Sequence, residues 1–183
     1  MTDPAPDAVD VEKILTATLS RVIDFLKYAE AKNAALLTFA SAWILATASL
    51  LTGGKQLPFH LDIALQYAVP AFGLAALIAI WSFIPKVKLN RFDKTALRAR
   101  NYLYFSDIAD VATTELLATI SERYSEGGAT SYYMKDLAIQ LAVNSQIVKR
   151  KFAFFAWGAY ALLLGIAIIV VTLAYQCWIG VAP

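Results

Sequence analysis

The sequence contains few of the residues on which catalytic and metal sites are built. Cys177 is the only cysteine among 183 residues, so the chain can form no internal disulfide and no thiolate metal site. His60 is the only histidine. The sequence has no nucleophile elbow, Walker loop or dinucleotide fingerprint, and no paired His/Asp/Glu spacing suits a metal ion. We therefore expect a protein that is not an enzyme and that uses no cofactor.

The N-terminus also lacks the basic segment of a secretory signal. Asp3, Asp7 and Asp10 make it acidic, and the first long apolar run begins only after Lys32. Because that run is longer than the apolar part of a signal peptide, we expect a membrane anchor that is retained. Residues 1–10 are rich in Asp, Pro and Ala, and we expect them to be disordered.

Three long stretches contain no charged residue. They lie between Lys32 and Lys55, between Asp62 and Lys86, and from Phe152 to the C-terminus. Hydrophobic residues form 59% of the chain, whereas soluble domains contain about 45–50%. A membrane helix needs about 20 apolar residues, and a charge at its centre costs about 2.5–3.5 kcal/mol. We therefore predict three transmembrane helices rather than soluble helices, which carry a polar face.

The basic residues lie almost entirely on one side of these spans. All of the 16 Lys and Arg residues except Lys55 belong to the N-terminal segment or to the segment between spans two and three. Basic segments next to membrane helices stay in the cytosol. We therefore expect the N-terminus and residues 86–151 to be cytosolic and the C-terminus to be periplasmic.

The expected fold is all-α, with three transmembrane helices continuous with a cytosolic helical bundle. No Gly or Pro separates the first cytosolic helix from span one, and a helical pattern continues into span three. The expected segments are a disordered N-terminus (1–10), a cytosolic helix (11–32), transmembrane helix one (33–54), an outer loop (55–62), transmembrane helix two (63–85), a cytosolic helical hairpin (86–151), transmembrane helix three (152–176) and an outer C-terminus (177–183).

Within the hairpin we expect a short basic linker and two helices. The first is expected from about Asp93 to Ser125 and the second from Tyr132 onward into span three. A pair of glycines beginning at Gly127 can supply the positive φ of the turn between them, and Ser131 is expected to cap the second helix.

Small residues recur at helical spacing in two of the spans. They are Gly158, Ala161 and Gly165 in span three, and Ala34, Thr38 and Ala42 in span one. Small residues let helix backbones approach closely in lipid. The pattern leaves open whether each stripe packs within one subunit or between subunits.

One face of the last cytosolic helix mixes amides, charges and branched aliphatic residues. At 100° per residue, one sector contains Asp136, Gln140, Asn144 and Lys151 together with Val143 and Ile147. This composition favours an interface or a ligand site, and a face that only meets water is the alternative.

Four short segments, taken together, resemble one protein family. Residues 29–37 (AEAKNAALL) open span one, residues 100–105 (RNYLYF) begin a cytosolic helix, and residues 136–141 (DLAIQL) lead through Ser145 to residues 149–152 (KRKF). Their order and spacing relative to the three spans are similar to those of the transmembrane effectors of Pycsar antiphage systems. The resemblance covers nearly the whole chain.

This resemblance implies a role in bacterial defence against phage. In that family a pyrimidine cyclase makes cyclic CMP or cyclic UMP on infection, and the effector senses the messenger and compromises the inner membrane, which leads to abortive infection. The resemblance thus implies the cyclic nucleotide as activator. The three spans imply the lipid bilayer as a second partner. We also expect further copies of the chain in a homo-oligomer, because one mononucleotide could barely supply the roughly 5.5 kcal/mol that a full switch requires.

Such a messenger presents one anionic phosphate and one flat polar base. Lys and Arg recognise phosphate, whereas amides and aromatic rings suit the base. The ligand-binding residues expected on these grounds are Lys32, Arg100, Asn101, Tyr104, Gln140, Asn144 and Lys151. Lys32 and Lys151 flank spans, so anchoring at lipid head groups is their alternative role.

Two other functions stay open from the sequence. The chain could be a scaffold or assembly subunit whose cytosolic helices bind another protein, or it could be a small channel or transporter. The absence of charged residues within the spans counts against a transporter. Binding of a cyclic nucleotide would separate a sensor from a scaffold.

Overall fold

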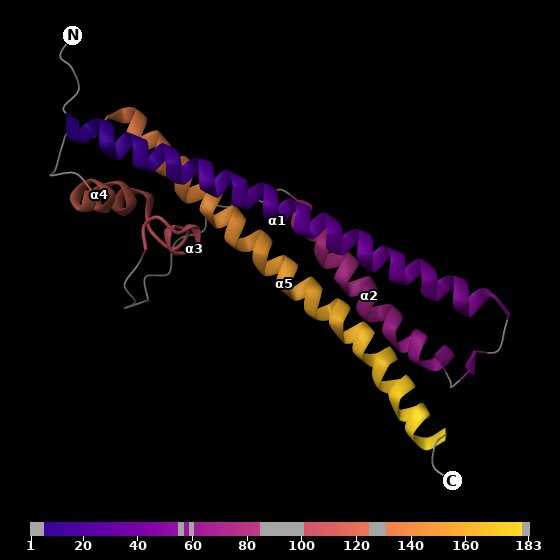
Figure 1. Cartoon of the computed structure of the whole chain (residues 1–183). Coiled ribbons are helices and arrows are strands. Elements are labelled where there is room, and N and C mark those ends of the chain that lie inside the picture. The colour runs from indigo at the N-terminus through magenta and orange to yellow at the C-terminus, as the bar shows by residue number, and fades with distance from the viewer. Residues whose placement is uncertain (1–5, 55–56, 59–60, 85–100, 125–130, 181–183) are drawn as a thin grey trace. The chain divides into compact units, whose positions relative to one another are not determined.

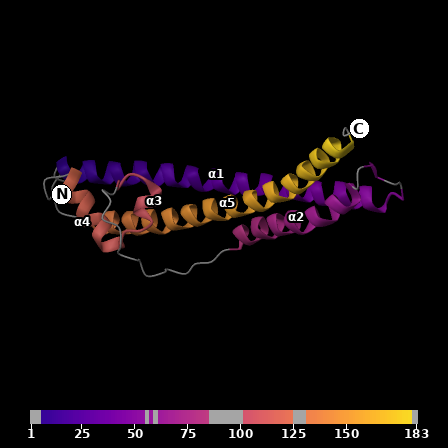
Figure 2. The ribbon, with the colours of Figure 1, turned by 90° about the horizontal axis from the view of Figure 1, so that it is seen from below.

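The computed structural model describes residues 6–54, 57–58, 61–84, 101–124 and 131–180. These residues form five helices and no strand, which confirms the all-α class (Figures 1 and 2). The helices are α1 (Pro6–Thr52), α2 (Leu61–Phe83), α3 (Phe105–Ile108), α4 (Thr113–Tyr124) and α5 (Tyr132–Gly180).

Three of these helices, α1, α2 and α5, are long and apolar enough to cross a membrane, as predicted. The 23 residues of α2 extend about 34 Å at 1.5 Å per residue, close to the thickness of about 30 Å of a bilayer's hydrocarbon core. With 47 and 49 residues, α1 and α5 are about twice as long as one crossing requires. Only part of each can therefore lie in lipid.

The chain divides into two compact units. The bundle unit comprises Met1–Ala29 and Lys86–Lys151, and the membrane unit comprises Glu30–Pro85 and Phe152–Pro183. The boundary between the units follows Ala29 in α1 and Lys151 in α5, and each helix continues through its boundary without a break. The predicted continuity of the first and last spans with the bundle is thereby confirmed, whereas the linker after α2 lies outside the described residues.

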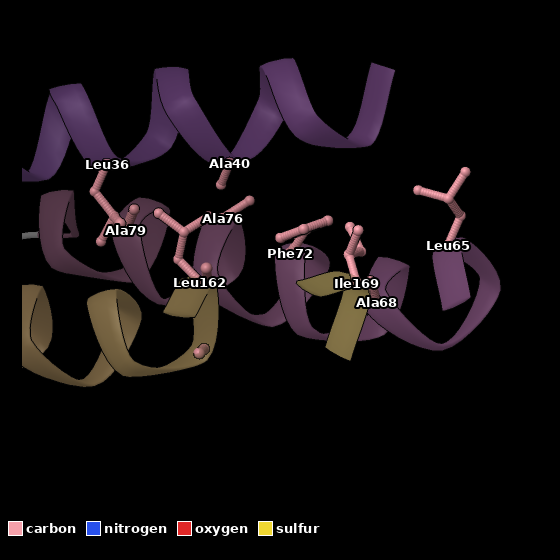
Figure 3. Close-up of a cluster of buried hydrophobic side chains, with 11 residues drawn as sticks. Leu36, Ala40, Leu65, Ala68, Phe72, Ala76, Ala79, Leu162 and Ile169 are labelled. Carbon is pink, nitrogen blue, oxygen red and sulfur yellow. The ribbon is translucent and has the colours of Figure 1, made fainter. Parts of the chain in front are cut away.

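The core of the membrane unit is built around α2, whose inward face carries small residues and one large ring. Ala68, Ala75 and Ala79 are fully buried there, and so is Phe72. Figure 3 shows Ala68, Phe72 and Ala79 with side chains of the two flanking helices, which are Leu36 and Ala40 from α1 and Leu162 and Ile169 from α5. Small side chains on α2 let both neighbours approach it closely.

The two stripes of small residues have different surroundings. A Cβ atom added at Gly158 would lie 2.5 Å from Leu36 Cδ2, and one added at Gly165 would lie 2.5 Å from Phe72 Cε1. The stripe of α5 therefore packs inside the subunit. The stripe of α1 is exposed along its whole length and comprises Ala34, Thr38 and Ala42.

Most of the remaining surface of the membrane unit is formed by large apolar side chains. Leu45 is 70% exposed, Leu77 is 65% exposed and Val171 is 66% exposed. Monomeric soluble proteins rarely expose contiguous apolar patches of this kind, because water disfavours them. Contact with lipid accounts for these exposed apolar side chains. The face of α1 formed by Ala34, Thr38 and Ala42 differs from this surface because its exposed side chains are small.

The bundle unit has an apolar core of its own. Buried side chains come from α1, α3, α4 and α5, and include Leu15, Val22, Ile108, Leu116, Ile120, Leu141 and Val148. The start of α5 is capped as predicted, because the Ser131 hydroxyl accepts a hydrogen bond of 3.2 Å from the Met134 N–H.

The N-terminal segment 1–10 is expected from the sequence to be disordered. In the structure α1 begins at Pro6, and residues 1–5 lie outside the described residues. Proline is well accepted at the first helical position, since the N–H that it lacks would have no intrahelical partner there.

The single helix predicted from Asp93 to Ser125 is wrong. Within the described part, α3 ends at Ile108 and α4 begins only at Thr113. The residues before α3 form a turn whose side-chain hydrogen bonds replace helical ones. The apolar spacing concealed the break because residues such as Val111 are buried in the connection as well.

Candidate ligand site in the bundle unit

Asn101 shapes the compact turn that precedes α3. Its Oδ1 accepts a hydrogen bond of 3.0 Å from the Leu103 N–H, and its own N–H donates to Asp107 Oδ2 at 2.9 Å. Its carbonyl accepts a further bond of 3.0 Å from the Tyr104 N–H. The side-chain oxygen of Asn101 is thus used by the turn, which leaves its amide nitrogen as the group available to a ligand.

Next to this turn, three aromatic rings form a cluster that joins α3 to α1. The centroids of Tyr104 and Phe105 are 4.8 Å apart, and those of Phe105 and Phe25 are 5.2 Å apart. The two outer residues keep open surface, since Phe25 is 41% exposed and Tyr104 is 46% exposed. A ring surface open on one side can stack a planar base.

The end of α4 also contacts the turn that precedes α3. The guanidinium carbon of Arg123 lies 4.8 Å from the ring centroid of Tyr102, which is itself buried. The Lys149 ammonium on α5 forms an ion pair with Asp110, which lies in the connection between α3 and α4. These two contacts position the turn and the aromatic cluster against α4 and α5.

The predicted polar stripe of α5 borders the buried face of that helix. Gln140 is exposed and Asn144 is half-buried, and the amide nitrogen of Asn144 donates to the Gln140 carbonyl at 2.9 Å. The buried face next to it includes Leu141 and Ser145. Within the described part of the chain, the side-chain amide of Gln140 has no hydrogen-bond partner, so it is available to a ligand or a protein partner.

Four of the predicted residues lie as two pairs, each pair on one element. Asn101 and Tyr104 share the turn before α3, and Gln140 and Asn144 share one face of α5. Among the described residues, no hydrogen bond or ring contact joins one pair to the other. Arg100 lies outside the described residues.

The two predicted lysines belong to different units. Lys151 is in the bundle unit, whereas Lys32 is in the membrane unit. The ammonium of Lys32 lies 5.0 Å from the ring centroid of Phe155 and 5.8 Å from that of Phe152. Lys32 thus makes cation–π contacts with two aromatic rings of α5 inside the membrane unit.

Sequence reasoning missed Phe25, which completes the aromatic cluster from α1. A helical pattern places Phe25 at the edge of the apolar stripe, where it looks like an ordinary core residue. Its contact with Phe105 joins residues that are 80 positions apart, and a helical pattern within α1 cannot predict a contact over that distance. The sequence does show that Arg21 lies one helical turn before Phe25, so a cation and an aromatic ring share one face of the helix.

Comparison with known proteins identifies the family. The profile of the Pycsar effector protein domain matches residues 14–177. The chain belongs to this Pycsar effector family. It is 38% identical over 160 residues to the Pycsar effector protein RsPycTM of a Rhizobium species, an alignment that covers 86% of this chain and 91% of that relative. No solved structure matches the chain.

The matched region reaches from residue 14 of α1 almost to the end of α5. It therefore includes most of the bundle unit and the membrane-spanning parts of all three long helices. The resemblance that rested on four short segments is confirmed over nearly the full length of the chain.

Proposed function

We propose that this Pycsar effector binds a cyclic pyrimidine mononucleotide, cyclic CMP or cyclic UMP, through its bundle unit and then impairs the integrity of the inner membrane. The infected cell stops growing or dies before the phage is released. The observation that carries the proposal is the continuity of α1 and α5 from the bundle unit into the membrane unit. The effector acts by changing conformation and not by catalysis.

The proposed orientation places the bundle unit in the cytosol and the C-terminus in the periplasm. All Lys and Arg residues except Lys55 lie on the bundle side of the spans, and basic segments are retained in the cytosol. This orientation exposes the bundle unit to a messenger made inside the cell.

The energetics favour an assembly of several copies. A ligand shifts a two-state equilibrium only by the difference between its affinities for the two states. A shift from 1:99 to 99:1 requires about 5.5 kcal/mol, which is a large share of the binding energy of one mononucleotide. A homo-oligomer distributes this requirement over several sites.

We further propose that the copies meet through the exposed small residues of α1, namely Ala34, Thr38 and Ala42. Large apolar side chains suit contact with lipid, whereas a strip of small ones lets a second helix approach closely. Ala42→Phe is expected to reduce self-association in nanodiscs at least about tenfold, as measured by single-molecule subunit counting, because the new ring blocks that approach. Val170→Phe, at a 56% exposed position on α5, is the matched control. Equal loss of association in both variants would argue against this face.

Titration of the full chain in nanodiscs tests the sensing function. We expect cyclic CMP or cyclic UMP to raise the unfolding temperature, because a ligand present at about 100 times its Kd stabilises the folded state by about 2.7 kcal/mol. Cyclic AMP and cyclic GMP are the matched controls, and calorimetry gives the affinity directly. If none of the four nucleotides changed stability or released heat, the sensing function would be rejected in favour of a scaffold that binds another protein.

A further inference from the structure

We propose that Arg21 and Phe25 of α1, together with Tyr104, form the surface that binds the messenger, with the phosphate at Arg21 and the base on the aromatic rings. This inference rests on the proposed sensing function and extends it to a defined site. Two of its three residues lie on a helix for which the sequence suggested no ligand contact except at Lys32.

The first argument is that the charge of Arg21 has no partner within the described part of the chain. Every other described Lys or Arg has an interaction within the structure, such as the ion pair of Lys27 with Asp24 at 3.2 Å. Among the Lys and Arg residues that the structure describes, Arg21 is the one whose side chain makes no hydrogen bond, ion pair or ring contact, and it is exposed. A guanidinium that is not neutralised and offers five N–H donors is the side chain best suited to a phosphate.

The second argument is the open aromatic surface beside it. Phe105 is half-buried and supports a ring on each side, and Phe25 and Tyr104 are 41% and 46% exposed. Because these residues belong to the bundle unit, lipid does not account for their exposure. A base that covered these rings would remove apolar surface from water and gain stacking energy.

The third argument is the spacing between the cation and the rings. Arg21 and Phe25 are four residues apart on an unbroken helix, so they share a face and their Cβ atoms are about 5–6 Å apart. In a cyclic mononucleotide the base and the phosphate are attached at opposite ends of one ribose, the base at C1′ and the phosphate across O3′ and O5′. One ligand can therefore reach both groups, and through Tyr104 it also contacts the turn before α3.

The test compares nucleotide affinity in variants of the full chain in nanodiscs. Arg21→Gln and Phe25→Leu are each expected to weaken cyclic CMP or cyclic UMP binding about tenfold or more, as measured by calorimetry. Lys27→Gln removes the same charge from a position about 120° around α1 from Arg21, and it is expected to leave the affinity within about twofold. Tyr133→Leu is the aromatic control, since Tyr133 is 54% exposed on α5.

A second measurement separates ligand contact from a structural role. Arg21→Gln should not change the weak binding of the nucleosides cytidine and uridine, which have no phosphate, whereas Phe25→Leu should weaken it. Arg21→Lys should restore part of the affinity for the cyclic nucleotides, and circular dichroism should show the same helix content in every variant. If the parent chain binds cyclic CMP or cyclic UMP and both Arg21→Gln and Phe25→Leu bind it equally well, this site is wrong and the sensing function stands. If the parent chain binds neither nucleotide, both fail.

Discussion

Replacement of Gly165 by alanine is expected to destabilise the membrane unit by about 1–3 kcal/mol, because the core has no space for one more carbon. The added Cβ would lie 2.5, 2.8 and 3.0 Å from three ring atoms of Phe72. That ring is fully buried and stacks on Trp43 with centroids 5.3 Å apart, so it has little freedom to move aside. Unfolding by SDS from mixed micelles measures the loss.

Gly73→Ala is the matched control, since a Cβ there meets no atom within 4 Å. Alanine is a better helix former than glycine, so this variant is expected to be as stable as the parent or more stable, by up to about 1 kcal/mol. Gly158→Ala should fall between the two, because its nearest contact, Leu36 Cδ2, is the end of a flexible side chain.

A compensating change makes the test specific. Phe72→Leu shortens the side chain that Gly165→Ala would strike, so the double variant should be more stable than the sum of the two single effects predicts. A Gly165→Ala variant that was as stable as Gly73→Ala would contradict the close packing of α5 on α2.

The sequence was sufficient for the membrane helices because their signal is local and energetically large. A single charge would disfavour insertion, so the charge-free run that spans most of Leu61 to Phe83 identifies α2 by itself. The Ser131 cap was predictable for the same reason, because the side chain and the N–H that it accepts from are three residues apart. Local chemistry decided each of these features.

Features that depend on distant contacts could not be predicted in this way. Both stripes of small residues have helical spacing, and only the side chains of Leu36 and Phe72 from other helices show that Gly158 and Gly165 face inward. Likewise, the role proposed for Phe25 depends on its contact with α3. The break before α4 was missed because apolar spacing continues through a connection that turns while it stays buried.

Proline substitution within α1 or α5 is expected to separate ligand binding from the membrane response. Ala31 and Ala153 are exposed alanines close to the points where these helices pass between units. Proline there removes one helical hydrogen bond and clashes with the preceding turn, at a cost of about 3 kcal/mol, while no buried side chain is lost. We expect Ala31→Pro and Ala153→Pro to bind the nucleotide within about twofold of the parent.

The response of the membrane should nevertheless fall at least about tenfold in both proline variants, measured as nucleotide-dependent dye release from proteoliposomes. A stiff helix passes a displacement from one end to the other, whereas a kinked one absorbs part of it at the kink. Ala31→Ser and Ala153→Ser keep the backbone N–H and should respond almost as the parent does. Full dye release from the proline variants would mean that the signal reaches the membrane by a route other than α1 and α5. The connection between α2 and the bundle unit would then be the remaining covalent route, because these are the three points at which the chain passes from one unit to the other.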